Sequence, residues 1–154
     1  FLRKLLASQG IRFDAEFFCP HFPKDGCGCR KPKTGLLDGY RATTHWGFRD
    51  LLSAVGAIYA PGRVVHDRNR ITGGGVTAGI DMALICVAEL LGEDTARSVQ
   101  LGIEYRPDPP FAAGHPDEAP EELTAAVSAF LTPLAAGMRP VLEAARRAHL
   151  EAAA

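Results

Sequence analysis

The feature that most constrains the fold is a long apolar helical pattern, residues 76–91, which follows three consecutive glycines. Its apolar positions occupy both sides of the helix, with one face formed by Val76, Ile80, Ala83, Leu84, Val87 and Leu91 and much of the other by Met82, Ile85 and Cys86. A helix that is apolar nearly all round is buried by its surroundings. The strongly apolar part, residues 80–91, contains Asp81 and Glu89 and is too short to span a bilayer. The pattern therefore predicts a helix packed inside a protein core.

Shorter patterns flank this helix on both sides, and each is bounded by glycine, proline or turn residues. In chain order they predict a short strand over 41–46, a helix over 48–55, a hairpin formed by 63–66 and 70–72, a helix over 93–101, a proline-rich extended segment over 105–120, and an alanine-rich helix from 120 onward that is interrupted near Pro133 and 137–140.

The overall composition excludes several classes of protein. The chain has 154 residues, 47% of them hydrophobic, and a net charge of −1. Such a chain has enough apolar material for one core, and its charge gives no attraction to nucleic acid or to an anionic membrane, so we expect neither as a partner. No secretory signal is visible and we expect a cytoplasmic protein, although a first residue of Phe rather than Met leaves an upstream N-terminus open.

The charge is unevenly distributed along the chain. Residues 1–37 contain seven basic and three acidic residues, a net charge of +4, and the remainder carries −5. Three of the four cysteines also lie in the first part. A composition step this sharp indicates two segments of different origin, and we place the boundary between 1–37 and 38–154.

Cys19, His21, Cys27 and Cys29 lie close together in a segment rich in proline and glycine. Three thiolates and one imidazole form a ligand set that suits a tetrahedral zinc ion, and short spacings allow one loop to wrap the ion. Because all four positions are filled by protein ligands, the sequence predicts a structural rather than a catalytic zinc. Disulfides or free buried thiols are the alternative.

Residues 1–37 resemble the zinc loop of histidinol-phosphatases in the haloacid-dehalogenase-like superfamily, on the motifs at 8–10, 19–21 and 27–33. The resemblance implies that Arg30 and Lys31 hold a substrate phosphate, the alternative being two solvated surface cations. Those phosphatases also need an Asp-x-Asp element and a later acidic element that binds magnesium. Neither is present in this sequence, so no magnesium site is identifiable and phosphate ester hydrolysis lacks a mechanism here.

The larger part of the chain is similar to the ThiJ/PfpI superfamily, with isonitrile hydratase as the nearest branch. The resemblance rests on residues 41–46, 63–65, 71–81, 100–101, 103–105 and 109–111. It implies an α/β fold, the C-terminal part of a flavodoxin-like domain related to class I glutamine amidotransferases, preceded here by the zinc-loop segment. It also implies a small-molecule substrate and a homodimer.

In that family a cysteine thiolate on a strand-to-helix elbow attacks the isonitrile carbon, an acidic side chain supplies protons, and water releases an N-substituted formamide. By resemblance the elbow lies shortly before Thr44 and His45, where this chain has the zinc-type loop, and the acid would precede Phe1. Neither group can be assigned to a residue here. His45 and Thr44 remain as neighbours of the active site, the alternative for His45 being a half-buried side chain hydrogen-bonded to the backbone.

The two resemblances together predict a chimera or a fragment. We expect an isonitrile hydratase-like protein that is inactive as this chain. The alternatives are a fragment of a zinc-loop phosphatase and a non-catalytic zinc-binding fragment. A partial flavodoxin-like sheet is also expected to expose apolar strand edges and helix faces.

Overall fold

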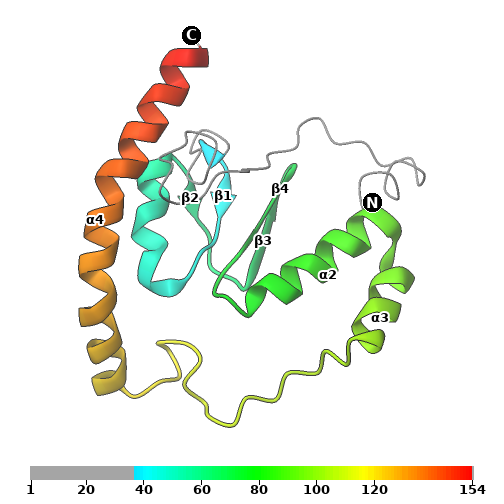
Figure 1. Ribbon diagram of the computed structural model, residues 1–154. Helices are drawn as coiled ribbons and strands as arrows, with labels where there is room; N and C mark the ends of the chain where they lie inside the picture. The colour runs from blue at the N-terminus through cyan, green and yellow to red at the C-terminus, as the bar shows by residue number, and fades with distance from the viewer. Residues whose placement is uncertain (1–36, 154) are drawn as a thin grey trace, which may run out of the picture. The chain divides into compact units, whose positions relative to one another are not determined.

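The computed structural model describes residues 37–153, which lie in one compact unit spanning Thr34–Ala154. In chain order its elements are β1 (Arg41–Ala42), the 3₁₀ helix η3 (Trp46–Val55), β2 (Ile58–Tyr59), β3 (Val64–Asp67), β4 (Arg70–Gly73), α2 (Ala78–Leu91), α3 (Glu93–Gly102) and α4 (Glu121–Ala153) (Figure 1).

The strands form two small sheets of different kinds. β1 and β2 pair in parallel, with Arg41 opposite Ile58, and η3 connects them. A helical connection between parallel strands is the usual α/β unit. β3 and β4 pair antiparallel and form the expected hairpin, whose turn contains Arg68 with a φ of 54°. The strand expected over 41–46 is shorter than predicted, because the chain turns into η3 directly after His45.

The core lies where η3 packs against β1, β2 and α4, and Figure 1 shows α4 running alongside η3. The apolar residues over 48–55 pack into this core as their spacing predicts, although the element is a 3₁₀ helix. It ends at Gly56, whose φ of 74° lets its N–H bond the carbonyls of Leu52 and Ser53. Buried hydrophobic side chains among the described residues are few and mostly small: Ala42, Leu51, Leu52, Ala54, Val55, Ala57, Ala60, Ala78, Ala96 and Leu142.

The apolar helix α2 is less buried than its sequence predicts. It begins at Ala78, so Val76 lies before the helix and is 96% exposed. Of its residues only Ala78 is fully buried, because β3, β4 and α3 are the elements that pack against it in the described part of the chain. The exposed Ile80 and Leu90 of α2, together with Ile58 and Tyr59 of β2, match the apolar faces and strand edges expected of a partial sheet.

The sequence predicts that the C-terminal helix is interrupted near Pro133 and 137–140. This prediction is wrong, because α4 continues through both Pro133 and Pro140. A proline inside a helix removes one backbone hydrogen bond and leaves the carbonyl four residues earlier without its partner. Here those carbonyls belong to Ala129 and Ala136, which are exposed, so water can solvate them. The extended segment between α3 and α4 and the short helix over 93–102 agree with the sequence prediction.

By length and composition alone, α4 could cross a membrane over Glu121–Glu151, where its most apolar window has a mean hydropathy of 1.3. One such helix is weak support for a membrane span, because helices of soluble proteins meet the same criterion.

Candidate functional site

The segment that leaves the carboxyl end of β1 carries the predicted site residues. Thr43 is buried and joins the two sheets: its N–H donates to Thr72 Oγ1 at 3.0 Å, and its hydroxyl donates to the carbonyl of Gly62 at 2.9 Å. Thr44 is half-buried and makes no hydrogen bond within residues 37–153. Ligands of α/β proteins commonly bind beyond the carboxyl ends of parallel strands, so this segment lies where a site is expected.

His45 caps the start of η3. Its Nδ1 accepts a hydrogen bond from the N–H of Gly47 at 3.1 Å, and its carbonyl accepts from Phe48 N–H at 2.8 Å. The ring centroid lies 5.4 Å from that of Trp46. Because Nδ1 accepts, the neutral ring carries its proton on Nε2. A half-buried His bonded to the backbone is the arrangement that we gave as the alternative to an active-site role.

The glycine run that precedes α2 lies close to the His45 side chain. A methyl group added at Gly75 would lie 3.7 Å from His45 Cδ2. The structure therefore brings together two features that the sequence singled out separately, the His45 segment and the glycines that precede α2.

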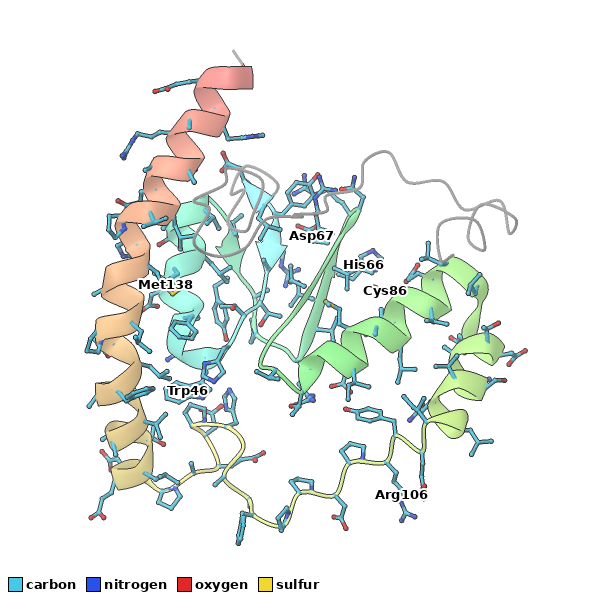
Figure 2. The ribbon with its side chains drawn as sticks, viewed as in Figure 1. Trp46, His66, Asp67, Cys86, Arg106 and Met138 are labelled. Carbon is cyan, nitrogen blue, oxygen red and sulfur yellow. The ribbon has the colours of Figure 1, made fainter. Side chains whose placement is uncertain are left out.

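Next to Trp46 lies a small pocket with a volume of about 140 Å³. Its walls come from the start of η3, the end of the segment that precedes α4, and the first turns of α4, with the lining residues Trp46, Ala113, His115, Pro116, Ala119, Leu123, Thr124 and Val127. Figure 2 shows Trp46 at the lower end of η3, close to α4. At about 140 Å³ this concavity is smaller than the roughly 300–1,000 Å³ of typical small-molecule sites.

Sequence reasoning missed a polar cluster that joins the hairpin, α2 and the extended segment. Arg63 Nε donates to Asp81 Oδ2 at 2.5 Å, Tyr105 Oη donates to Asp81 Oδ1 at 2.7 Å, and Arg63 Nη2 lies 3.4 Å from Thr77 Oγ1. Desolvation would raise the pKa of Asp81, but the hydrogen bonds from Tyr105 and Arg63 and the charge of Arg63 outweigh it, so the pKa is lowered. The bond to Asp81 raises the pKa of both Tyr105 and Arg63. The three residues lie far apart in sequence, and no spacing pattern reveals them.

The cluster predicts a pH-dependent contribution of Asp81 to stability. Its folded-state pKa is lowered, so the contribution is complete above the unfolded pKa of about 3.9 and is lost as the pH falls through the folded pKa. We expect Asp81→Asn to lower the free energy of unfolding by about 1 kcal/mol at pH 7, and the difference from the parent to shrink below about pH 4. Urea titrations over pH 3–7 measure this. Asp108→Asn, at an exposed position without a hydrogen bond or ion pair to the described residues, is the control, and we expect it to leave the free energy of unfolding unchanged. A difference that stays constant down to pH 3 contradicts the assignment.

Cys86 is the free cysteine of the described region, and it is a poor nucleophile. Burial, and then the charge of Glu89, raise the pKa of its thiol, which keeps it protonated. It lies within α2, as Figure 2 shows, and not at a strand-to-helix elbow.

The predicted zinc ligands Cys19, His21, Cys27 and Cys29 and the phosphate-binding candidates Arg30 and Lys31 lie outside the described residues. Within residues 37–153 no three His, Cys, Asp or Glu side chains gather as a metal site.

No family model matches the chain. Among solved structures, a ThiJ/PfpI family protein from Pseudomonas syringae superposes with a TM-score of 0.63 at 48% sequence identity, over 73% of this chain and 45% of that chain. In sequence and in fold the chain is thus similar to ThiJ/PfpI proteins, which supports the predicted flavodoxin-like α/β fold.

Among curated proteins, the isonitrile hydratase of Pseudomonas putida is 60% identical over 86 residues, which are 56% of this chain and 38% of that protein. A shorter stretch of 44 residues is 59% identical to the histidine biosynthesis bifunctional protein HisB of Legionella pneumophila (strain Lens), over 29% of this chain and 12% of that protein. The chain spans less than half the length of each of these relatives. It therefore carries both predicted resemblances, as a chimera would.

Proposed function

We propose that this chain derives its larger part from an isonitrile hydratase, an enzyme that adds water to R–N≡C to give the formamide R–NH–CHO. The observation that carries the proposal is the 60% identity to the Pseudomonas putida enzyme. The geometry agrees with it, because His45, Gly75 and the pocket beside Trp46 lie together beyond the end of β1.

The same proposal holds that the 154 residues do not hydrate isonitriles by themselves. The reaction needs a thiolate to attack the isonitrile carbon and an acid to protonate it. Cys86 is unsuited because its pKa is raised, and the residues that precede Thr44 carry the motifs of a phosphatase zinc loop rather than a nucleophile elbow.

A turnover assay tests this proposal. We expect the purified chain, incubated with isopropyl isocyanide, to form N-isopropylformamide no faster than buffer does. After metal removal, a thiol alkylator with mass mapping is expected to find no fast-reacting cysteine. Enzyme-like turnover that is abolished by replacing one cysteine would overturn the proposed inactivity and identify the nucleophile.

We further propose that the N-terminal segment, 1–37, is a fused piece of a histidinol-phosphatase-type protein. The 59% identity to HisB over 44 residues of this chain supports this origin, and the four ligand residues of the segment suit a structural zinc ion. The ion would cross-link the loop, and Arg30 and Lys31 would remain free to hold a phosphate. No phosphatase turnover is expected in the presence of magnesium.

The relation to isonitrile hydratase also underlies our proposals for the substrate class, the assembly and the compartment. The substrate class would be a small organic molecule, the assembly a homodimer, and the compartment the cytoplasm. Neither a nucleic acid nor a membrane is proposed as a partner.

A further inference from the structure

Helix α4 carries an exposed apolar stripe, which is formed by large hydrophobic side chains that are each at least 38% exposed: Leu123, Val127, Phe130, Leu134, Met138 and Val141. Phe130, near the middle of the stripe, is 71% exposed. Hydrophobic residues scattered singly over a surface are ordinary, whereas a continuous exposed patch marks an interaction site. The stripe is therefore a candidate contact surface.

The spacing of these residues places them in one straight row. From position 123 to position 141 the stripe advances 18 residues in five steps, an average of 3.6 residues per step, which is one turn of an α-helix. The row therefore runs parallel to the helix axis for about 27 Å.

The residues of α4 that face the core lie on a different side of the helix. Leu131 lies against Gly47 of η3, and Ala135 and Leu142 pack in the core cluster. Each of these three directly follows a member of the stripe: Phe130, Leu134 and Val141. Consecutive residues of an α-helix point about 100° apart. Packing on η3 therefore leaves the stripe uncovered.

The two ends of α4 differ in charge. Residues 117–122, which lead into and begin the helix, contain four acidic side chains, whereas residues 139–147 contain three arginines and one glutamate. A second helix of the same kind, packed antiparallel, would place each acidic end beside a basic end and would also oppose the two helix dipoles. A parallel arrangement would place like charges together.

We propose that the stripe is the contact surface of a homodimer, in which α4 of one protomer packs antiparallel against α4 of a second copy. A two-fold axis brings the same patch of both copies together, so the second copy presents a stripe of equal length with the charges in reverse order. The axis passes between Phe130 and Leu134, which places Leu123 of one copy beside Val141 of the other. The inference rests on the homodimer proposed above and deepens it by naming the surface that the two copies share.

Small residues on α4 favour this contact. Ala126, Gly137 and Ala144 flank the stripe on the side away from η3. A Cβ added at Gly137 would meet no atom within 4 Å. Because the distance between two packed helices depends on the size of the side chains at the contact, the second helix can approach closely.

The mass of the protein in solution tests the interface. In sedimentation experiments we expect the average mass of the parent to rise from that of a monomer toward twice that value between about 5 and about 500 µM. Phe130→Glu places a charge in the middle of the stripe and is expected to weaken association at least about tenfold. Ala136→Glu adds the same charge at an exposed position on the opposite side of α4, so this matched control dimerises as the parent does. Circular dichroism checks that both variants keep the helix.

Cysteine cross-linking tests the antiparallel arrangement. Leu123→Cys and Val141→Cys proteins, mixed and oxidised, are expected to form a disulfide between the two new cysteines, which mass mapping distinguishes from links through the native cysteines. Neither variant alone is expected to form a link at its new position. In an antiparallel pair the two equivalent residues lie about 27 Å apart, whereas a disulfide needs Cα atoms within about 7 Å.

Several outcomes overturn this interface. A parent that stays monomeric over the whole range excludes it. If Phe130→Glu dimerises as the parent does, the homodimer is retained but uses another surface. Self-cross-linking of either cysteine variant excludes the antiparallel arrangement. A monomeric parent that sediments with phosphatidylcholine vesicles, and loses this in Phe130→Glu, shows that the stripe contacts lipid instead. A failed isonitrile hydratase assignment shows separately, in the isocyanide turnover assay.

Discussion

Replacing Cys27 by Ser is expected to reduce the zinc content of the purified protein from about one ion per chain to nearly none. The proposed site needs three thiolates and one imidazole, and a serine hydroxyl does not ionise at neutral pH or bind zinc as a thiolate does. With one ligand missing, the remaining three leave an open position that a structural site does not tolerate. Elemental analysis of protein prepared without a metal-affinity tag measures the effect.

The chain provides its own matched control for this experiment. Cys86→Ser changes a cysteine of α2, in a region where no metal-ligating group of three or more residues gathers, and is expected to leave the zinc content unchanged. His21→Ala is expected to behave like Cys27→Ser. If the parent contains well under one zinc ion per chain, or if Cys27→Ser and His21→Ala both retain it, the zinc site is wrong.

Truncating Leu142 to Ala is expected to lower the free energy of unfolding by about 2–4 kcal/mol, or to prevent folding altogether. Leu142 is 8% exposed and is the buried large side chain that α4 contributes to the described core. Most other buried hydrophobic residues there are alanines, so little apolar surface remains to compensate. Small domains have only about 5–15 kcal/mol of stability in total. Urea denaturation followed by circular dichroism measures the loss.

Leu134→Ala is the control on the same helix. Leu134 is 48% exposed, so its truncation removes less buried surface and leaves a smaller cavity. We expect a loss of under about 1 kcal/mol. Equal effects of the two truncations would show that α4 does not pack on η3 through Leu142.

The local elements were predictable because each is set by neighbouring residues. Gly92 ends the apolar helix, the turn around Arg68 and Asn69 closes the hairpin, and prolines keep the segment before α4 extended. Burial was harder to predict. An apolar pattern shows which faces of α2 would favour a core, but not whether other elements are present to cover them. Likewise, the effect of Pro133 and Pro140 depends on whether their freed carbonyls face water, and this is decided by packing.

The candidate site likewise has one part that the sequence predicts and another that depends on the tertiary structure. The amino-acid sequence alone determined the two family resemblances, the prediction of a zinc ligand set and the interest of Thr44 and His45, because each is a pattern of residue types along the chain. Only the tertiary structure decided that Tyr105 bonds Asp81 and that Trp46 shares a pocket with Thr124. These partners are separated by long stretches of chain, and they approach each other only because the intervening elements pack as they do.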